Sequence, residues 1–179
     1  MQGRPARLSS PTMDLPSGHD GGVIYKDTSR RLRYASGYIE LGMINDASDE
    51  LEAIRAEDRF AVPVLVVRLE LHMAANHWET VVGLGRELAQ QSPKHERAWI
   101  CWAYALRELQ RVDEARAVLL EAEPLHGRTS ALLHYNLACY YCLLGEQATA
   151  RQRLAQACKL APGFKEDARH DPDLANLAK

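Results

Sequence analysis

Two of the four cysteines form a CxxC motif, a spacing that metal-binding and redox proteins use. Cys139 and Cys142 lie in the stretch YNLACYYCLLGEQATARQRLAQACKLAP, and Cys158 follows near its end. A structural zinc site needs four ligands, and the sequence holds no second CxxC. A redox CxxC belongs at a helix N-terminus, where the dipole lowers the thiol pKa, whereas this pair falls inside a helical pattern. We therefore interpret these cysteines as small packing residues and keep a thiol- or zinc-dependent function using Cys139 and Cys142 as the alternative.

Other residue types that carry chemistry form no recognisable catalytic set. The sequence contains seven histidines but no HExxH, GxSxG or phosphate-binding loop. His72 and His77 are five residues apart and do not share a helix face, and we interpret His72 and His134 as core residues. The GLG at 83 to 85 lacks the third glycine and the preceding strand of a dinucleotide-binding loop. We expect a non-catalytic protein without a metal or cofactor.

Composition narrows the classes of partner. The 22 Lys and Arg against 24 Asp and Glu give a net charge of −2, with no basic surplus for nucleic acid. The longest apolar run, AVPVLVV, is much shorter than a membrane span. The first twenty residues lack the apolar core of a secretory signal. We expect a cytoplasmic protein with reduced cysteines and neither a nucleic-acid nor a membrane partner.

A helical pattern with short breaks begins near Thr28 and repeats at steps of 34 or 35 residues. The first half of each unit carries one recurring position, which is Ala35, Leu69, Ala103 or Ala138. A break follows at Gly42, Asn76, Gln110 or Gly145, and the second half carries Ala47, Val81, Ala115 or Ala150. Small residues let two antiparallel helices approach to about 8–10 Å. The sequence therefore predicts helix-turn-helix units over 28–61, 62–95, 96–130 and 131–164.

This pattern resembles the tetratricopeptide repeat, whose motif has Leu-Gly or Leu-Ala, then Tyr, Gly, Ala, a bulky apolar residue, Ala and Pro. The last unit matches it best, with LAxxY, Gly145, Ala150, Ala157 and Pro162. The second unit departs most, because Leu69 and Val81 stand at small positions and Gly85 at a bulky one. The resemblance implies an all-α fold, a right-handed superhelical solenoid of about four repeats with a C-terminal capping helix over 165–179.

The ends of the chain do not repeat. Residues 1–22 hold ten Gly, Pro or Ser. This segment therefore has too few apolar side chains to offset the entropy lost on ordering. We predict a flexible tail over 1–27, native or added for expression, and leave open whether it occupies the binding groove. The segment GFKEDARHDPDLANLAK would cover the last repeat. In it, Asp171 and Pro172 form an N-cap and first-turn pair.

The resemblance also implies a binding surface. Stacked helix pairs form a concave groove, which in the family is lined by the first helix of each pair and receives peptides. Carried over residue by residue, the groove is lined by Leu32, Ser36, Ile39, Val66, Glu70, Met73, Arg97, Ile100, Tyr104, Arg107, Tyr135, Asn136, Cys139 and Cys142.

The chemistry of this groove indicates the kind of partner. Most of its residues are apolar or aromatic, and Arg97 and Arg107 supply cations. We expect an amphipathic helix or extended peptide with apolar anchors and an acidic group. Leu32 and Ser36 stand where the family's carboxylate clamp needs Lys and Asn, which argues against the acidic C-termini of heat-shock chaperones. The sequence thus predicts a scaffold or adaptor that binds another protein, with a chaperone-like secretion protein as one form of it.

Overall fold

The computed structural model describes residues 24–178, and most of the predicted tail, residues 1–23, lies outside this part together with Lys179. The described residues are helical throughout, joined by short turns, and contain no strand. The predicted all-α class is therefore confirmed. The chain divides into two compact units, whose described residues are 24–102 and 103–178. We describe each unit by itself.

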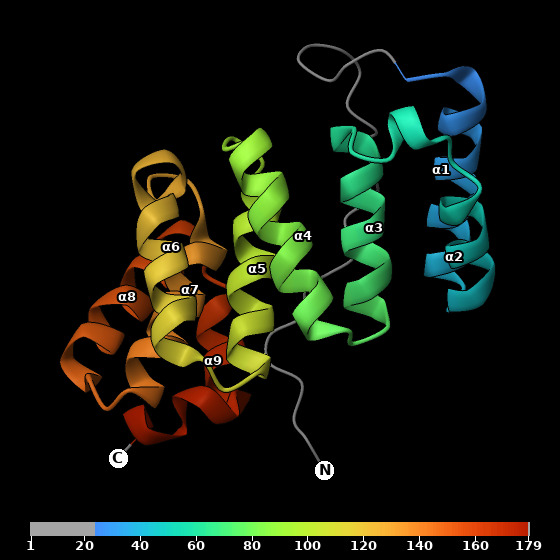
Figure 1. The fold of residues 1–179 in the computed structure, drawn as a ribbon. Helices are drawn as coiled ribbons and strands as arrows, with labels where there is room; N and C mark the ends of the chain where they lie inside the picture. The colour runs from blue at the N-terminus through green and yellow to red at the C-terminus, as the bar shows by residue number, and fades with distance from the viewer. Residues whose placement is uncertain (1–23, 179) are drawn as a thin grey trace. The chain divides into compact units, whose positions relative to one another are not determined.

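The first unit holds two helix pairs (Figure 1). Helix α1 (Lys26–Glu40) packs against α2 (Ile44–Glu52), and α3 (Val62–Ala74) packs against α4 (Trp78–Gln91). A single 3-10 turn, η1 (Ala56–Asp58), lies between the pairs. It is fixed by the buried carboxylate of Asp58, which accepts hydrogen bonds from the Thr28 hydroxyl at 2.5 Å and the Tyr25 backbone N–H at 3.3 Å. Helix α5 (Glu96–Glu108) begins in this unit and ends in the next.

The second unit holds α6 (Val112–His126), then the pair α7 (Ala131–Leu143) and α8 (Gln147–Leu160). Helix α9 (Phe164–His170) packs on α8, and the 3-10 helix η2 (Pro172–Ala178) packs on α7 and α8. Pro172 separates the last two elements, because the residue before a proline avoids the helical conformation; Asp171 has ψ 118°. The Asp171 carboxylate then accepts the backbone N–H of Asp173 at 2.9 Å, as expected of an N-cap.

The turns inside the helix pairs share one backbone shape. Among the described residues, positive φ occurs at Gly42 (74°), Asn76 (57°), Gln110 (62°) and Gly145 (83°). These are the break positions that the repeat predicts. The next residue donates its N–H to a carbonyl five residues back in every case, at 2.8–2.9 Å: Met43 to Tyr38, His77 to His72, Arg111 to Leu106 and Glu146 to Tyr141. Each first helix therefore ends in a Schellman motif.

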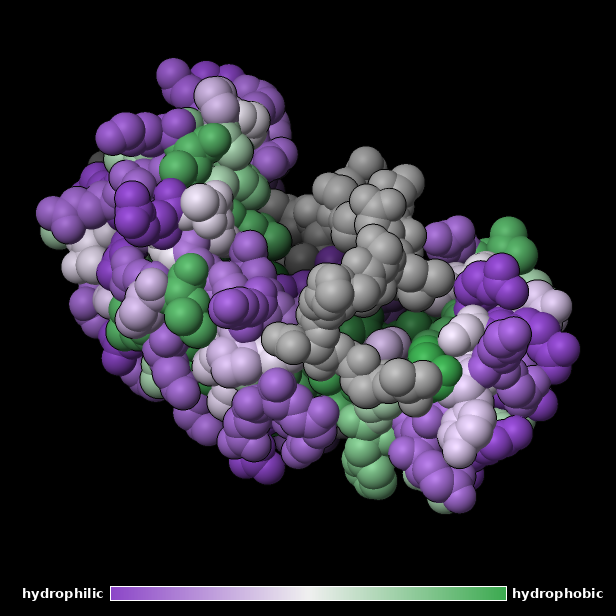
Figure 2. All heavy atoms as spheres, turned by 90° about the horizontal axis from the view of Figure 1, so that it is seen from above, coloured by the Kyte–Doolittle hydropathy of each residue, from purple (hydrophilic) through white to green (hydrophobic). Residues whose placement is uncertain are grey.

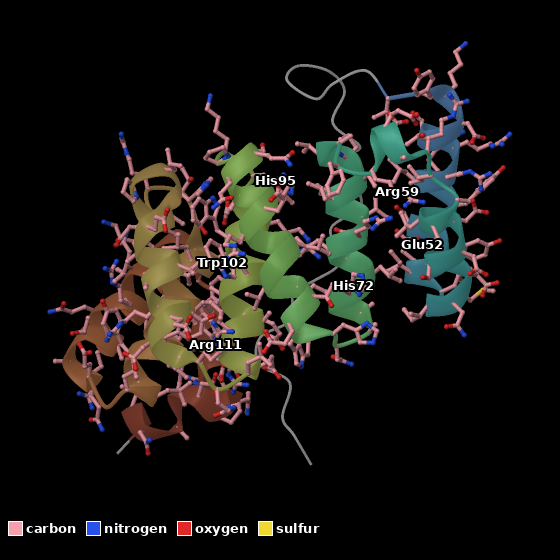
Figure 3. The ribbon with its side chains drawn as sticks, in the orientation of Figure 1. Glu52, Arg59, His72, His95, Trp102 and Arg111 are labelled. Carbon is pink, nitrogen blue, oxygen red and sulfur yellow. The ribbon has the colours of Figure 1, made fainter. Side chains whose placement is uncertain are left out.

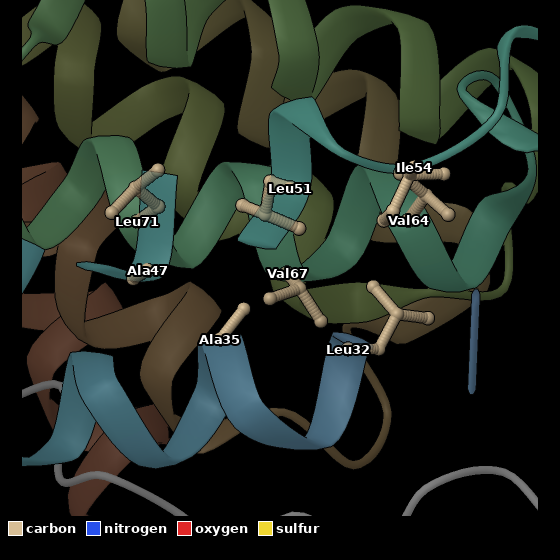
Figure 4. Packing of buried hydrophobic residues seen from close by; sticks show 8 residues of the cluster. All are labelled: Leu32, Ala35, Ala47, Leu51, Ile54, Val64, Val67 and Leu71. Carbon is tan, nitrogen blue, oxygen red and sulfur yellow. The ribbon is translucent and has the colours of Figure 1, made fainter. Parts of the chain in front are cut away.

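The recurring helix positions form the cores. Ala35, Ala47, Ala103, Ala115, Ala138 and Ala150 are fully buried, as are Leu69 and Val81 at the equivalent places in the second repeat. In the first unit one cluster is formed by residues of α1, α2 and α3 and of the connection after α2, and comprises Leu32, Ala35, Ala47, Leu51, Ile54, Val64, Val67 and Leu71 (Figure 4). Ala35 and Ala47 lie among larger side chains in this cluster (Figure 4), as expected of small residues that let paired helices approach closely.

Gly85 explains how the second repeat departs from the motif. A Cβ added at Gly85 would lie 2.8 Å from the Cβ of Trp102, 3.1 Å from its Cα and 3.2 Å from the carbonyl oxygen of Ala98. The backbone of α4 is therefore in direct contact with α5. A bulky residue at this position is excluded because Trp102 already fills the space.

Candidate partner-binding face

All of the residues predicted to line a groove lie on the first helices of the pairs, α1, α3, α5 and α7. Their burial divides them into two groups. Six are buried, namely Leu32, Ser36, Ile100, Tyr135, Cys139 and Cys142. Eight are half-buried, namely Ile39, Val66, Glu70, Met73, Arg97, Tyr104, Arg107 and Asn136. Only the second group offers surface in this structure. In the view of Figure 2, hydrophilic side chains cover most of the described surface, with hydrophobic side chains in small groups.

Two of the predicted residues in the first unit belong to the interior. Leu32 is 1% exposed and is a member of the α1–α2–α3 core. Ser36 donates its hydroxyl to the carbonyl oxygen of Leu32 at 2.9 Å, within its own helix. These positions do not form a wall for a partner, because the pairing of α1 with α2 and α3 uses the same helix face.

Arg97, the predicted groove cation that lies in the compact unit 24–102, already forms an ion pair. Arg97 Nε lies 3.2 Å from a carboxylate oxygen of Glu70, and both side chains are half-buried. Burial raises the pKa of Glu70, and Arg97 opposes that shift. The nearby thiol of Cys101 is buried, which raises its pKa to about 11. The face of α3 and α5 in this unit therefore presents a neutralised charge pair beside Val66 and Met73.

In the second unit, Arg107 on α5 binds an acid near the C-terminus. Its Nε donates to Asp173 Oδ2 at 2.8 Å, a second guanidinium nitrogen donates to Asp173 Oδ1, and a third donates to Glu108 at 2.7 Å. Burial alone would lower the pKa of Arg107, but Asp173 and Glu108 raise it above its ordinary value. A two-pronged contact of this kind is the usual way in which arginine recognises a carboxylate.

Asp171 completes a buried polar cluster with α7. The Tyr135 hydroxyl donates to Asp171 Oδ2 at 2.8 Å, and the Cys139 thiol lies 3.8 Å from the same oxygen. The ring of Phe164 stacks on Tyr135, with 4.6 Å between centroids. Burial, together with the bond to Asp171, raises the pKa of Tyr135. The part of the predicted groove on α7 is thus covered by the chain's own C-terminal residues.

Helix α7 is suited to this buried position. Its sequence, ALLHYNLACYYCL, is apolar on nearly all sides, which is typical of a helix enclosed by others. Contacts with α6, α8 and η2 enclose it. Ser130 caps its start by accepting the backbone N–H of Leu133 at 2.9 Å, which fixes where the helix begins and so the register of Tyr135 and Cys139.

The two cysteines of the CxxC motif lie in an environment that disfavours thiolate. Burial, with the charges of Asp171 and Asp173, raises the pKa of Cys139 well above its ordinary value, and burial also raises that of Cys142. Cys139 Sγ and one oxygen each of Asp171 and Asp173 lie within 4.8 Å of one another. Arg107 and Tyr135 already bind those carboxylates, and the guanidinium charge opposes a cation there. This arrangement gives the thiol or zinc alternative no support.

Solved structures with similar folds were found, although neither models of protein families nor curated protein sequences gave a match. A crystal structure of MamA protein aligns with a TM-score of 0.72 at 15% identity, over 84% of this chain and 80% of that one. MamA from Desulfovibrio magneticus aligns at 0.69 and 14% identity, over 87% and 97% of the two chains. The thermophilic TPR protein TTC0263 of Thermus thermophilus aligns at 0.63 and 18% identity, over 79% and 78%. The chain has the tetratricopeptide-repeat fold.

Two contacts in the tetratricopeptide-repeat chain were not anticipated from its sequence. Nδ1 of His72, which Figure 3 shows near the end of α3, lies 3.2 Å from Nδ1 of His77. The Schellman motif explains this pair, because it brings together the residues on either side of the turn, and the repeat phase could have revealed it. The second contact, of Arg107 with Asp173, has no comparable sequence signal.

Proposed function

We propose that the chain is a non-catalytic scaffold that binds a segment of another protein along the first helices of its repeats. In this proposal the repeats span 28–61, 62–95, 96–130 and 131–164, residues 165–179 form the cap, and the protein is cytoplasmic. It is supported by one observation above all: half-buried apolar or aromatic side chains recur at the predicted groove positions of α1, α3 and α5, namely Ile39, Val66, Met73 and Tyr104. No helix among the described residues is long and apolar enough to span a membrane.

Val66 in the first unit and Tyr104 in the second are the residues that best test this face. Both are half-buried, and Val66 adjoins the Arg97–Glu70 pair on the same helix face. Burial, with the charge of Glu108, raises the pKa of Tyr104 to about 12, so its hydroxyl stays protonated and the side chain uncharged at neutral pH. A partner helix or peptide would find apolar anchors beside charges that are already balanced.

The experiment compares proteins that co-purify with three variants. Val66→Glu and Tyr104→Glu each place a charge on the proposed face, and Leu120→Glu places the same charge on α6, where the leucine is already 37% exposed. We expect partners to be retained by wild type and Leu120→Glu and lost at least ten-fold with the other two, at unchanged helical circular dichroism. Equal retention by all four proteins would show that the first helices do not bind the partner.

A further inference from the structure

We propose that residues 164–178, the C-terminal segment, are an intramolecular ligand that covers a peptide-docking face, and that the competing partner is an acidic peptide with an aromatic anchor. The docking face consists of Arg107 on α5 and Tyr135, Cys139 and Tyr140 on α7. This inference rests on the proposed function and names the site and the chemistry of its ligand.

Aromatic and acidic side chains of the segment contact Tyr135 and Arg107 of the docking face. Phe164 stacks on the ring of Tyr135, and Asp171 accepts the hydroxyl of the same tyrosine. Asp173 receives two donors from Arg107. Pro172 holds the chain extended at Asp171, so that the two carboxylates reach different donors. The docking face therefore recognises a sequence pattern in the segment, which is an aromatic residue, then six residues, then Asp-x-Asp-Leu.

Little apolar surface holds the segment in place. None of the residues of α9 is buried. Within 164–177, Leu174 is the single buried apolar side chain, and the other buried residues are Asp171 and Asp173. A permanent cap would be held by a continuous apolar stripe. A segment held mainly by ionic and polar contacts can be exchanged for another that makes the same contacts.

The segment also leaves one polar group of the docking face without a hydrogen bond in the described part of the chain. Tyr140 is 2% exposed, and its hydroxyl has no hydrogen-bond partner among the described residues. It lies close enough to Asp173 and Arg107 for their charges to affect its pKa. A buried donor without an acceptor is costly. A partner that brings an additional carboxylate or carbonyl to this hydroxyl would therefore bind better than the chain's own segment, which gives the competition a direction.

A direct test uses the full chain and a labelled peptide with the sequence of residues 163–178. Fluorescence anisotropy measures its binding to wild type, to a Phe164→Ala/Asp173→Asn variant, in which the segment is weakened, and to Glu166→Gln. The last is a matched control, because Glu166 pairs with Arg169 at the exposed surface of α9. We expect the double variant to bind the peptide at least ten-fold more tightly than wild type and the control. A peptide carrying Asp173→Asn should bind at least ten-fold more weakly.

Equal affinity of all three proteins for the peptide, or no binding by the double variant, would overturn the proposal. Hydrogen exchange on wild type gives a second measurement that does not depend on a variant. An intramolecular ligand opens locally, so the amides of 164–178 should exchange at least ten-fold faster than those of α7 and α8. Exchange of all three at one common rate would identify the segment as a permanent cap.

The two levels of the hypothesis fail separately. If the peptide does not bind but Val66→Glu and Tyr104→Glu still lose partners that Leu120→Glu retains, the scaffold function stands and the intramolecular ligand does not. If the peptide binds the double variant while all three glutamate variants keep their partners, the docking face stands and the wider face does not.

Discussion

Replacing Gly85 with alanine should destabilise the protein, whereas the same change at Gly83, two residues earlier in α4, should stabilise it. In a helix interior alanine is favoured over glycine by about 1 kcal/mol. Gly83 is exposed, and an added Cβ would meet nothing within 4 Å. We therefore expect Gly83→Ala to gain about 0.5–1 kcal/mol of unfolding free energy.

At Gly85 the same gain is opposed by a clash. The added Cβ would lie 2.8 Å from the Cβ of Trp102 and 3.1 Å from its Cα. Carbon atoms prefer separations of about 3.5–4.0 Å, so α4 and α5 would have to separate by roughly 1 Å. The atoms of Trp102 belong to or adjoin the backbone and cannot rotate away. Overpacking of this kind costs roughly 1–3 kcal/mol, and after the helix gain we expect a net loss of about 1 kcal/mol.

Urea unfolding followed by circular dichroism measures both variants. The transition midpoint should rise for Gly83→Ala and fall for Gly85→Ala, with unchanged slopes, so that the shifts report stability alone. The fluorescence of Trp102, at the contact, should change in folded Gly85→Ala and not in folded Gly83→Ala. Equal stabilisation by the two substitutions would refute the close approach of α4 to α5. It would also refute the explanation that contact with Trp102 requires a glycine at position 85 of the second repeat.

Three further changes follow from the structure. Gln110→Gly should raise the free energy of unfolding, measured by urea denaturation, by about 0.5–1 kcal/mol, because glutamine is strained at φ 62°. A thiol reagent at neutral pH should modify half-buried Cys158 at least ten-fold faster than Cys101, whose pKa is about 11. Burial and the nearby His77 lower the pKa of His72 below 6.5, so stability should fall as pH drops below 6.5 through the folded-state pKa, and the urea midpoint of His72→Gln should show a shallower fall.

The fold could be predicted because its determinants are local and repeat. A small residue at Ala35 or Ala138 specifies a helix contact, and a residue with positive φ at Gly42 or Gly145 specifies a turn, each within a few residues of chain. Even Gln110, a residue type that seldom adopts positive φ, takes this conformation because the helices on both sides require it. The position within the repeat therefore determined the backbone conformation more strongly than the type of residue at that position.

The candidate site could be predicted only in part, because its counter-charges come from a segment that does not repeat. Arg107 and Asp173 are 66 residues apart, and no period relates them. Tyr135 is buried by Phe164 and Asp171 rather than by a neighbouring repeat. Leu32 faces the core because α1 packs against both α2 and α3 through the helix face that carries it. A pattern transferred from a family places side chains on a helix but does not show what covers them.

The common shape of the turns also makes the chain modular. Removing residues 43–76 would join Gly42 directly to His77, so that a left-handed residue would again precede a second helix and the same carbonyl bond could close. Duplicating that stretch would be equally free of strain at its junction. A cut or insertion between these turns that does not span a whole repeat would put a helical residue at a left-handed position, so length changes made at the turns should be tolerated in whole repeats of 34 or 35 residues.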